Sequence, residues 1–267
     1  MPVSTSKTVL LETQKYFNKI SSVSTDIKDK ESVFKFSEGI RDLGLWDSTV
    51  CWPLRSLQNA GAGSVAYSLG GLGIYNGTLV NNPTWGSEGI NFNGSNTYIQ
   101  NSDLLDNAEG TIAAFAFTNN AIVTGEGHRL IQMGTGLLPG IEIGATNSFP
   151  NVGIEAYYTQ LASEGVGRNV SPPTSIVGVR FGAFGVFSNA QSITRYINKG
   201  STISNLSVTG NYQSAQGIRI GARVNNSLYW NGSISFAMYS STKFSDNDVL
   251  NFYNLYKSTL GKGLGLP

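Results

Sequence analysis

The chain has almost no cysteine or histidine, and this shortage excludes several kinds of chemistry. Cys51 is the only cysteine and His128 the only histidine. A single cysteine can form neither an intramolecular disulfide nor a thiolate metal cluster. A single histidine leaves no partner for a histidine-based metal site or a spare member for a catalytic triad. Because Cys51 lies in the apolar run 50–53, we expect a buried and inert thiol.

Charge and long apolar runs are also scarce. Charged residues make up 13% of the 267 residues, and the net charge is +1. Such a balance provides no electrostatic footprint for nucleic acid or for an anionic membrane. No run approaches the roughly 18 apolar residues of a membrane-spanning helix, and the first residues lack the apolar stretch of a secretory signal. We therefore expect no nucleic-acid partner, no membrane partner and synthesis in a reducing cytoplasm.

What the chain does contain favours short strands joined by tight turns. Hydrophobic residues make up 40% of it, and there are 32 glycines. This composition is typical of a mainly β protein. Asn93-Gly94, between the apolar pair Ile90 and Phe92 and the next apolar run, predicts a β-hairpin. Further strands are predicted within residues 111–117, 128–133, 140–144, 152–158, 175–187 and 192–200.

The first part of the chain differs in composition from the rest, because charged residues are concentrated before residue 43. Leu10, Phe17 and Ile20 have helical spacing and are predicted to share one helix face. Gly39 is a plausible helix end, and a second short helix is predicted to follow it to about Leu43. We predict a helical arm over residues 1–45 and one domain over residues 46–267. The arm could cap its own domain or dock on a neighbouring subunit, since an apolar helix face needs something to bury against.

The last fifty residues carry the most informative pattern. Two alternating apolar segments, 218–222 and 234–238, are followed by a short amphipathic helix that begins near Ser245. Ser245 is predicted as its N-cap and Asp248 as residue N3, where a carboxylate meets exposed amides. Asp246 and Asp248 could be mistaken for a metal-binding pair, but capping explains both.

These segments resemble the concanavalin A-like, laminin-G-type jelly rolls. The resemblance rests on the closing strand G-I-R-I at 217–220 and the F-S-D step at 244–246. It also rests on N-G-T-L at 76–79, Trp85 and the strand pair within 89–99. It implies a mainly β fold, a two-sheet antiparallel jelly-roll sandwich with an N-terminal helical arm and a short C-terminal helix.

The sequence offers little sign of catalysis. Members of this fold that cleave polysaccharides carry acids two residues apart on one strand, a spacing that pairs the carboxylates. This chain has no such run. Glu142 and Glu155 are lone acids on predicted strands; they could face one another across strands, or each could face solvent. We predict no enzyme activity, no catalytic residue, no metal-ligating residue and no cofactor, although the resemblance would allow a calcium ion.

Two tryptophans are the candidate ligand-binding residues. Trp85 and Trp230 each lie beside a glycine-containing turn, where an indole ring could stack on a sugar. Core or rim positions of the sandwich explain them equally well.

The functional hypothesis rests on the roles that proteins with this kind of fold commonly have. A jelly roll without a secretion signal or catalytic acids, preceded by an arm, looks like a non-enzymatic structural protein of a bacteriophage virion. It would be a head decoration, head fibre or tail-fibre component located in the virion. Its arm would attach it to other virion proteins or to copies of itself as a homo-oligomer. The alternative is a lectin-like, carbohydrate-binding adhesion module that binds a host-surface glycan.

Overall fold

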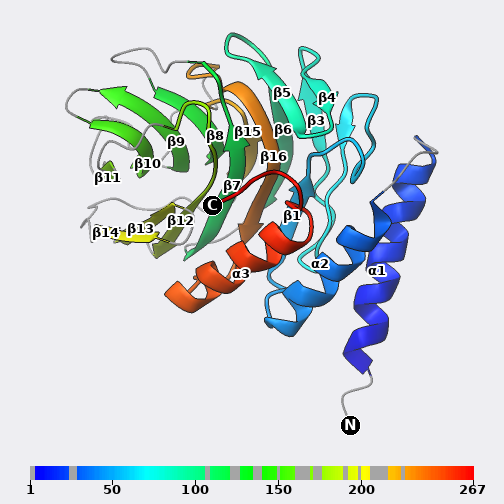
Figure 1. Cartoon of the computed structure of the whole chain (residues 1–267). Helices are drawn as coiled ribbons and strands as arrows, with labels where there is room; N and C mark the ends of the chain where they lie inside the picture. The colour runs from blue at the N-terminus through cyan, green and yellow to red at the C-terminus, as the bar shows by residue number, and fades with distance from the viewer. Residues whose placement is uncertain are drawn as a thin grey trace.

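The chain folds into a β-sandwich with a layer of helices on one side (Figure 1). The computed structural model describes residues 4–23, 29–105, 109–120, 127–134, 140–148, 151–159, 169–170, 176–188, 192–197, 200–204, 216–223 and 226–267. All strand pairings within the named strands are antiparallel.

One sheet, which we call sheet A, has the strand order β14-β13-β12-β7-β16-β5-β4, and β1 also pairs with β16. Its strands are β1 (Thr49–Pro53), β4 (Thr84–Gly86), β5 (Gly89–Asn93), β7 (Glu109–Phe117), β12 (Arg180–Ser188), β13 (Ser192–Ile197), β14 (Gly200–Ser204) and β16 (Asn231–Ser240).

The opposite sheet, sheet B, has the order β11-β10-β9-β8-β15-β6-β3-β2. Its strands are β2 (Val65–Ala66), β3 (Gly77–Val80), β6 (Tyr98–Leu105), β8 (Gly127–Met133), β9 (Gly140–Ser148), β10 (Asn151–Thr159), β11 (Asn169–Val170) and β15 (Gln216–Ile220). The two sheets face each other across a shared core, which confirms the predicted jelly-roll sandwich.

Alternation along the strands builds this core. On β7, Ile112 and Ala114 point toward sheet B, and on β9, Ile141 and Ile143 point back toward sheet A; all four are fully buried. Side chains two apart share a face, so the residues between them lie on the outer faces. The character of those outward residues differs between the two sheets.

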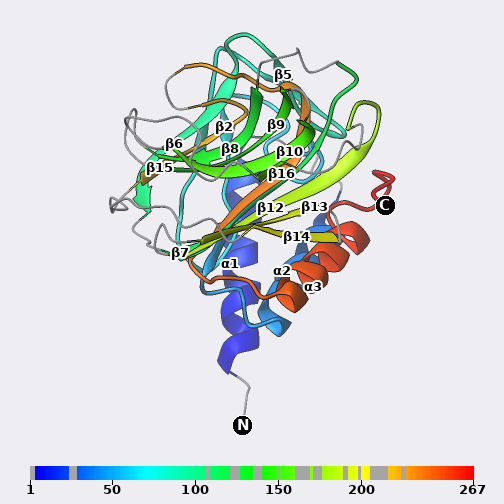
Figure 2. The ribbon, with the colours of Figure 1, turned by 90° about the vertical axis from the view of Figure 1, so that its left-hand side faces the viewer.

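Three helices lie against the outer face of sheet A (Figures 1 and 2). They are α1 (Ser4–Ser21), α2 (Lys30–Asp42) and α3 (Asp246–Ser258). Phe115 of β7 and Phe236 of β16 form one buried cluster with Phe36 of α2 and Phe252 of α3. The helix layer therefore rests on a second hydrophobic core of its own.

The buried side of α1 differs from the predicted one. Phe17 and Ile20 are buried in the helix-layer core as expected, but Leu10 is 56% exposed. The first turns of α1 extend away from the sandwich, toward the N-terminus in Figure 2. Helical spacing alone therefore overestimated how much of this helix is covered. The predicted boundary between residues 45 and 46 stays a prediction.

Helix α2 is not broken at Gly39, as the sequence had suggested; one continuous helix runs from Lys30 to Asp42, close to the predicted end at about Leu43. A Cβ atom at Gly39 would lie only 2.3 Å from Leu255 Cδ1 of α3. The glycine is therefore a point of close helix–helix approach rather than a helix end.

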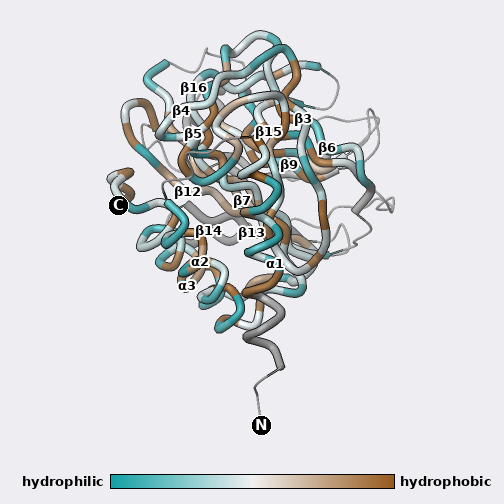
Figure 3. The backbone as a smooth tube through the Cα atoms, turned by 90° about the vertical axis from the view of Figure 1, so that its right-hand side faces the viewer, coloured by the Kyte–Doolittle hydropathy of each residue, from teal (hydrophilic) through white to brown (hydrophobic). Residues whose placement is uncertain are grey.

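Along the three helices, hydrophilic and hydrophobic stretches of the backbone alternate (Figure 3).

The C-terminal helix begins as predicted. The hydroxyl oxygen of Ser245 accepts a hydrogen bond from the backbone N–H of Asp248 at 3.2 Å. The Asp248 carboxylate accepts one from the Ser245 backbone N–H at 2.8 Å. This capping box confirms the prediction for both residues.

The predicted hairpin at Asn93-Gly94 is wrong. Gly94 does adopt a left-handed turn conformation, with φ of +74°. However, β5 before it pairs with β4 and β16 in sheet A, whereas β6 after it pairs with β3 and β15 in sheet B. The turn carries the chain from one sheet to the other.

Among the described residues, no helix is long and apolar enough to cross a membrane.

Candidate functional site

The outer face of sheet B carries a row of polar side chains. Gln100 on β6 pairs with Arg219 on β15, Arg219 pairs with Gln132 on β8, and Gln132 pairs with Glu142 on β9. Each member is flanked by residues that point into the core, such as Ile218 and Ile220 beside Arg219. Alternation therefore directs all four away from the core, onto one face.

Glu142 forms the centre of a buried ion-pair cluster on this face. Its carboxylate lies 2.9 Å from Nε of Arg129 and 3.1 Å from Nη2 of Arg223. Glu142 is fully buried, and the side chain of Arg129 is 3% exposed. Gly144 allows this arrangement, because a Cβ there would meet the side chain of Arg129 at 2.8 Å. One carboxylate thus holds two guanidinium groups over strands β8 and β9.

Arg219 lies beside this cluster but is bound differently. Its Nε donates to Oε1 of Gln100 at 2.9 Å, and its Nη1 donates to the carbonyl of Arg223 and to Oδ1 of Asn226, both at 2.8 Å. Its guanidinium carbon stands 4.1 Å from the ring centroid of Tyr98, a cation–π distance. Burial lowers the pKa of Arg219, opposed by the neighbouring tyrosines.

The rim of the site is more accessible than its floor. Tyr98, Gln100 and Tyr229 are half-buried and Asn226 is exposed, whereas Arg219 is 8% exposed. The rings of Tyr98 and Tyr229 lie 6.3 Å apart. The backbone of Tyr229 is held in place by His128, whose Nδ1 lies 2.6 Å from its carbonyl oxygen. Tyrosine rings and planar polar groups therefore surround a recessed guanidinium.

The structure changes the interpretation of the two lone acids. Glu142 was considered as a solvent-facing residue or as one half of a catalytic pair, but it is buried and ion-paired with two arginines. Glu155 lies on β10, where its backbone pairs with Gly144, and its side chain is outside the described part of the structure.

The two tryptophans occupy different environments. Trp230 is 1% exposed and lies in the core between the sheets, 6.2 Å from the ring of Phe181. Trp230 therefore takes the core position that the sequence also allowed, and its ring is not available to stack on a sugar. Trp85 lies on β4, the edge strand of sheet A, and is half-buried, with its Nε1 donating to the carbonyl of Gly63 at 3.2 Å. Its role in ligand binding stays a prediction.

Sequence reasoning missed Tyr98, Gln100, Arg219 and Tyr229. A signal for Arg219 was present, because the run Ile218-Arg219-Ile220 places one charged side chain on the face opposite two core residues. No local signal identified its neighbours, since Gln100 and Arg219 are 119 positions apart and meet only through the pairing of β6 with β15.

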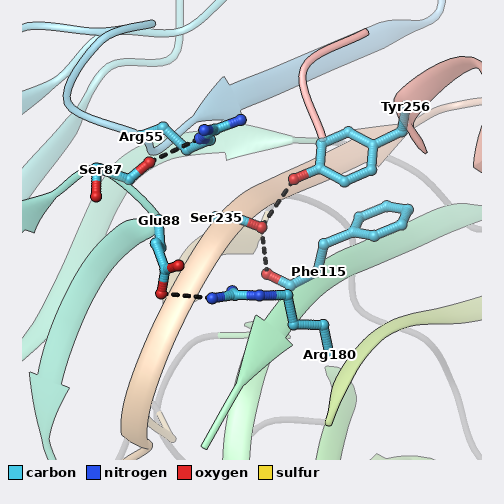
Figure 4. Close-up of polar contacts among 7 residues, drawn as sticks. All are labelled: Arg55, Ser87, Glu88, Phe115, Arg180, Ser235 and Tyr256. Atoms are coloured by element: carbon cyan, nitrogen blue, oxygen red, sulfur yellow. Dashed lines mark hydrogen bonds and ion pairs between the residues drawn. The ribbon is translucent and has the colours of Figure 1, made fainter. Parts of the chain in front are cut away.

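A second polar network lies on the sheet A side and ties the helix layer to the sandwich (Figure 4). The hydroxyl of Ser235 donates to the carbonyl of Phe115 at 3.1 Å and lies 2.8 Å from the hydroxyl of Tyr256 on α3. On the same side, Arg180 pairs with Glu88 and stacks on Phe117, with its guanidinium carbon 4.6 Å from the ring centroid. Each of these groups has a partner within the chain, so this network is structural.

Comparisons with known proteins support the fold. No family model and no curated protein matches the chain. A Trypanosoma rangeli sialidase in complex with sialic acid is similar, with a TM-score of 0.55 and 11% identity over 86% of this chain and 39% of the sialidase. A mutant of that sialidase that displays trans-sialidase activity gives a TM-score of 0.58 and 11% identity, over 87% of this chain and 39% of the mutant. The carbohydrate-binding module CBM40 of a Ruminococcus gnavus IT-sialidase, bound to α2,3-sialyllactose, gives 0.40 and 15% identity over 57% of this chain and 94% of the module.

These matches show a concanavalin A-like jelly-roll fold. They overturn the prediction that the chain is not an enzyme, which was drawn from the lack of paired acids on one strand, because sialidases share this fold. At 11% identity, and with the chain spanning 39% of each sialidase, the likeness extends to the fold alone. No match described above links the chain to bacteriophage virion proteins.

Proposed function

We propose that this chain binds a carbohydrate on the outer face of sheet B, at a site formed by Tyr98, Gln100, Arg219, Asn226 and Tyr229. The observation that carries the proposal is the contrast between the recessed, hydrogen-bonding floor and the half-buried tyrosine rings at its rim. Sugars present hydroxyl groups at their edges and C–H groups on their faces, so planar polar side chains beside aromatic rings suit both.

The comparisons are consistent with this proposal. One of the fold's solved neighbours is a sialidase in complex with sialic acid, so the architecture occurs in a protein that recognises a sugar. For the alternative, a virion structural role, the described residues offer in support only the exposed side chains of Leu10 and Leu11 on α1.

Binding of the full chain to a glycan array with neutral, sialylated and uronate-containing oligosaccharides tests the function. We expect a defined subset of glycans to bind, and Tyr229→Ala to lower the affinity for that subset at least about tenfold, as loss of a stacking partner does. Trp85→Ala serves as the matched aromatic control, because Trp85 lies on the opposite sheet.

Two results would argue against this site. Loss of binding on Trp85→Ala with no change on Tyr229→Ala would move the site to the edge of sheet A. No binding to any glycan on the array, by a chain that melts cooperatively, would refute carbohydrate binding itself.

A further inference from the structure

We propose that Arg219 is an anion-binding residue and that the glycan bound on sheet B carries a carboxylate group. This inference rests on the proposed function and names the chemical class of its ligand. It is argued from the position of Arg219, from the chemistry of its partners and from the orientation of its guanidinium group.

Arg219 occupies the middle of the sheet. It lies on β15, which β8 and β6 flank on either side, and its side chain points away from the core. It is 8% exposed, so most of its hydration is lost. A guanidinium in such a place requires compensating partners, because burying an unpaired charge is costly.

The hydrogen-bond partners of Arg219 among the described residues are neutral. The three acceptors are the side-chain oxygens of Gln100 and Asn226 and the backbone carbonyl of Arg223. Within the described residues, no carboxylate pairs with Arg219, and its second terminal nitrogen, Nη2, has no hydrogen-bond partner. The guanidinium therefore keeps unused donors and an uncompensated charge.

Arg180 on sheet A provides a direct contrast. Both arginines stack on an aromatic ring, Arg219 on Tyr98 at 4.1 Å and Arg180 on Phe117 at 4.6 Å. Arg180, however, also pairs with the carboxylate of Glu88 (Figure 4). Arg219 lacks such an anion within the described residues, and an external carboxylate would supply it.

The guanidinium is also held in a fixed orientation. The ring of Tyr98 supports one face of its plane, and the bond from Nε to Gln100 fixes its rotation. A planar, preoriented fork matches the two oxygens of a carboxylate and loses little freedom on binding.

The test measures affinity of the full chain for α2,3-sialyllactose and for its methyl ester, which keeps the sugar but removes the charge. We expect the acid to bind at least about tenfold more tightly, the typical range for a hydrogen bond to a charged group. A tetragalacturonate and its methyl ester form a second arm, which distinguishes a sialic acid from a uronic acid as the source of the carboxylate.

Variants locate the effect. Arg219→Gln should remove the preference for the acid over the ester, so that the two forms bind with equal affinity. Arg180→Gln, the matched control, should leave the preference intact. The comparison of acid with ester on the unmodified chain needs no variant, so it stands even if Arg219→Gln fails to fold.

The two proposals fail in different ways. Equal affinity for acid and ester, or binding of neutral glycans alone, would overturn the role of Arg219 and leave carbohydrate binding in place. A preference for the acid that persists in Arg219→Gln would likewise overturn it. Loss of binding to both forms in Tyr229→Ala, together with the charge preference in the unmodified chain, would support both proposals.

Discussion

The outer faces of the two sheets are built on the same alternation and have opposite character. On sheet A, the outward residues include Phe115 and Phe236; helices α2 and α3 pack over them, and α1 packs against α2. On sheet B, the outward residues include Gln100, Arg219 and Glu142, which form hydrogen bonds and ion pairs instead. The period-two pattern makes both sheets, and the identity of the outward residues decides which face becomes a second core and which becomes a site.

The largest expected effect comes from breaking the packing on sheet A. Phe115 is fully buried, and its ring centroid lies 3.8 Å from that of Tyr256 and 5.7 Å from that of Phe184. Phe115→Ala should lower the free energy of unfolding by about 3–5 kcal/mol, through lost burial and the cavity left behind. Urea denaturation measures this change.

Leu10→Ala is the matched control for that prediction, because Leu10 belongs to the helix layer but is 56% exposed. Its effect should stay within about 0.5 kcal/mol. A loss below about 1 kcal/mol for Phe115→Ala would mean that the helices do not pack on sheet A as described.

Strand β7 shows why the fold could be predicted from the sequence, whereas the side to which each strand residue points could not. Its run of apolar residues showed imperfect alternation, because Ile112 and Ala114 face the inner core while Ala113 and Phe115 face the helices. A strand buried on both sides loses the period-two signal. The turn formers and the apolar spacing predicted a mainly β protein, and the resemblance carried by residues 217–220 and 244–246 supplied the jelly-roll sandwich.

The site was less accessible to prediction because it is assembled from distant segments. Tyr98 and Gln100 come from β6, Arg219 from β15, and Tyr229 from the connection that follows it. Aromatic residues beside glycine turns were the only local signal for sugar binding, and that signal selected Trp230, which fills the core instead. Strand order, which local sequence does not encode, brings the polar residues together.

A somewhat smaller effect is expected from breaking the ion-pair cluster on sheet B. Glu142→Gln keeps the shape of the side chain but removes the charge that Arg129 and Arg223 share. Removing one partner of a buried ion pair destabilises by about 3 kcal/mol or more. Thermal and urea unfolding of this variant measure the loss.

Glu31→Gln is the control, since Glu31 pairs with Lys35 on the exposed side of α2, where ion pairs contribute little. It should leave the unfolding midpoint unchanged. If Glu142→Gln also left the unfolding midpoint unchanged, the ion-pair cluster would be open to water. The outer face of sheet B would then resemble a solvent-exposed protein surface.

The smallest expected change is that caused by Tyr256→Phe at alkaline pH, and it sharpens the comparison between the two faces. In the helix-layer core, burial raises the pKa of Tyr253 to about 12 and raises the pKa of Tyr256 and of the Cys51 thiol. In the unfolded chain, these groups ionise near their ordinary values, about 8.5 for cysteine and about 10 for tyrosine. A raised folded-state pKa contributes stability below the unfolded value, and this stability is lost as pH rises above it.

We therefore expect the free energy of unfolding to fall above about pH 8.5 and more steeply above about pH 10, where each buried tyrosine adds about 1.4 kcal/mol per pH unit. Tyr256→Phe should reduce the steeper slope by one proton's contribution. Urea denaturation between pH 7 and pH 11 measures both. A flat profile, or an unchanged slope in Tyr256→Phe, would show that water reaches the hydroxyl groups beneath the helices, and the difference between the two faces would then be smaller than the buried side chains indicate.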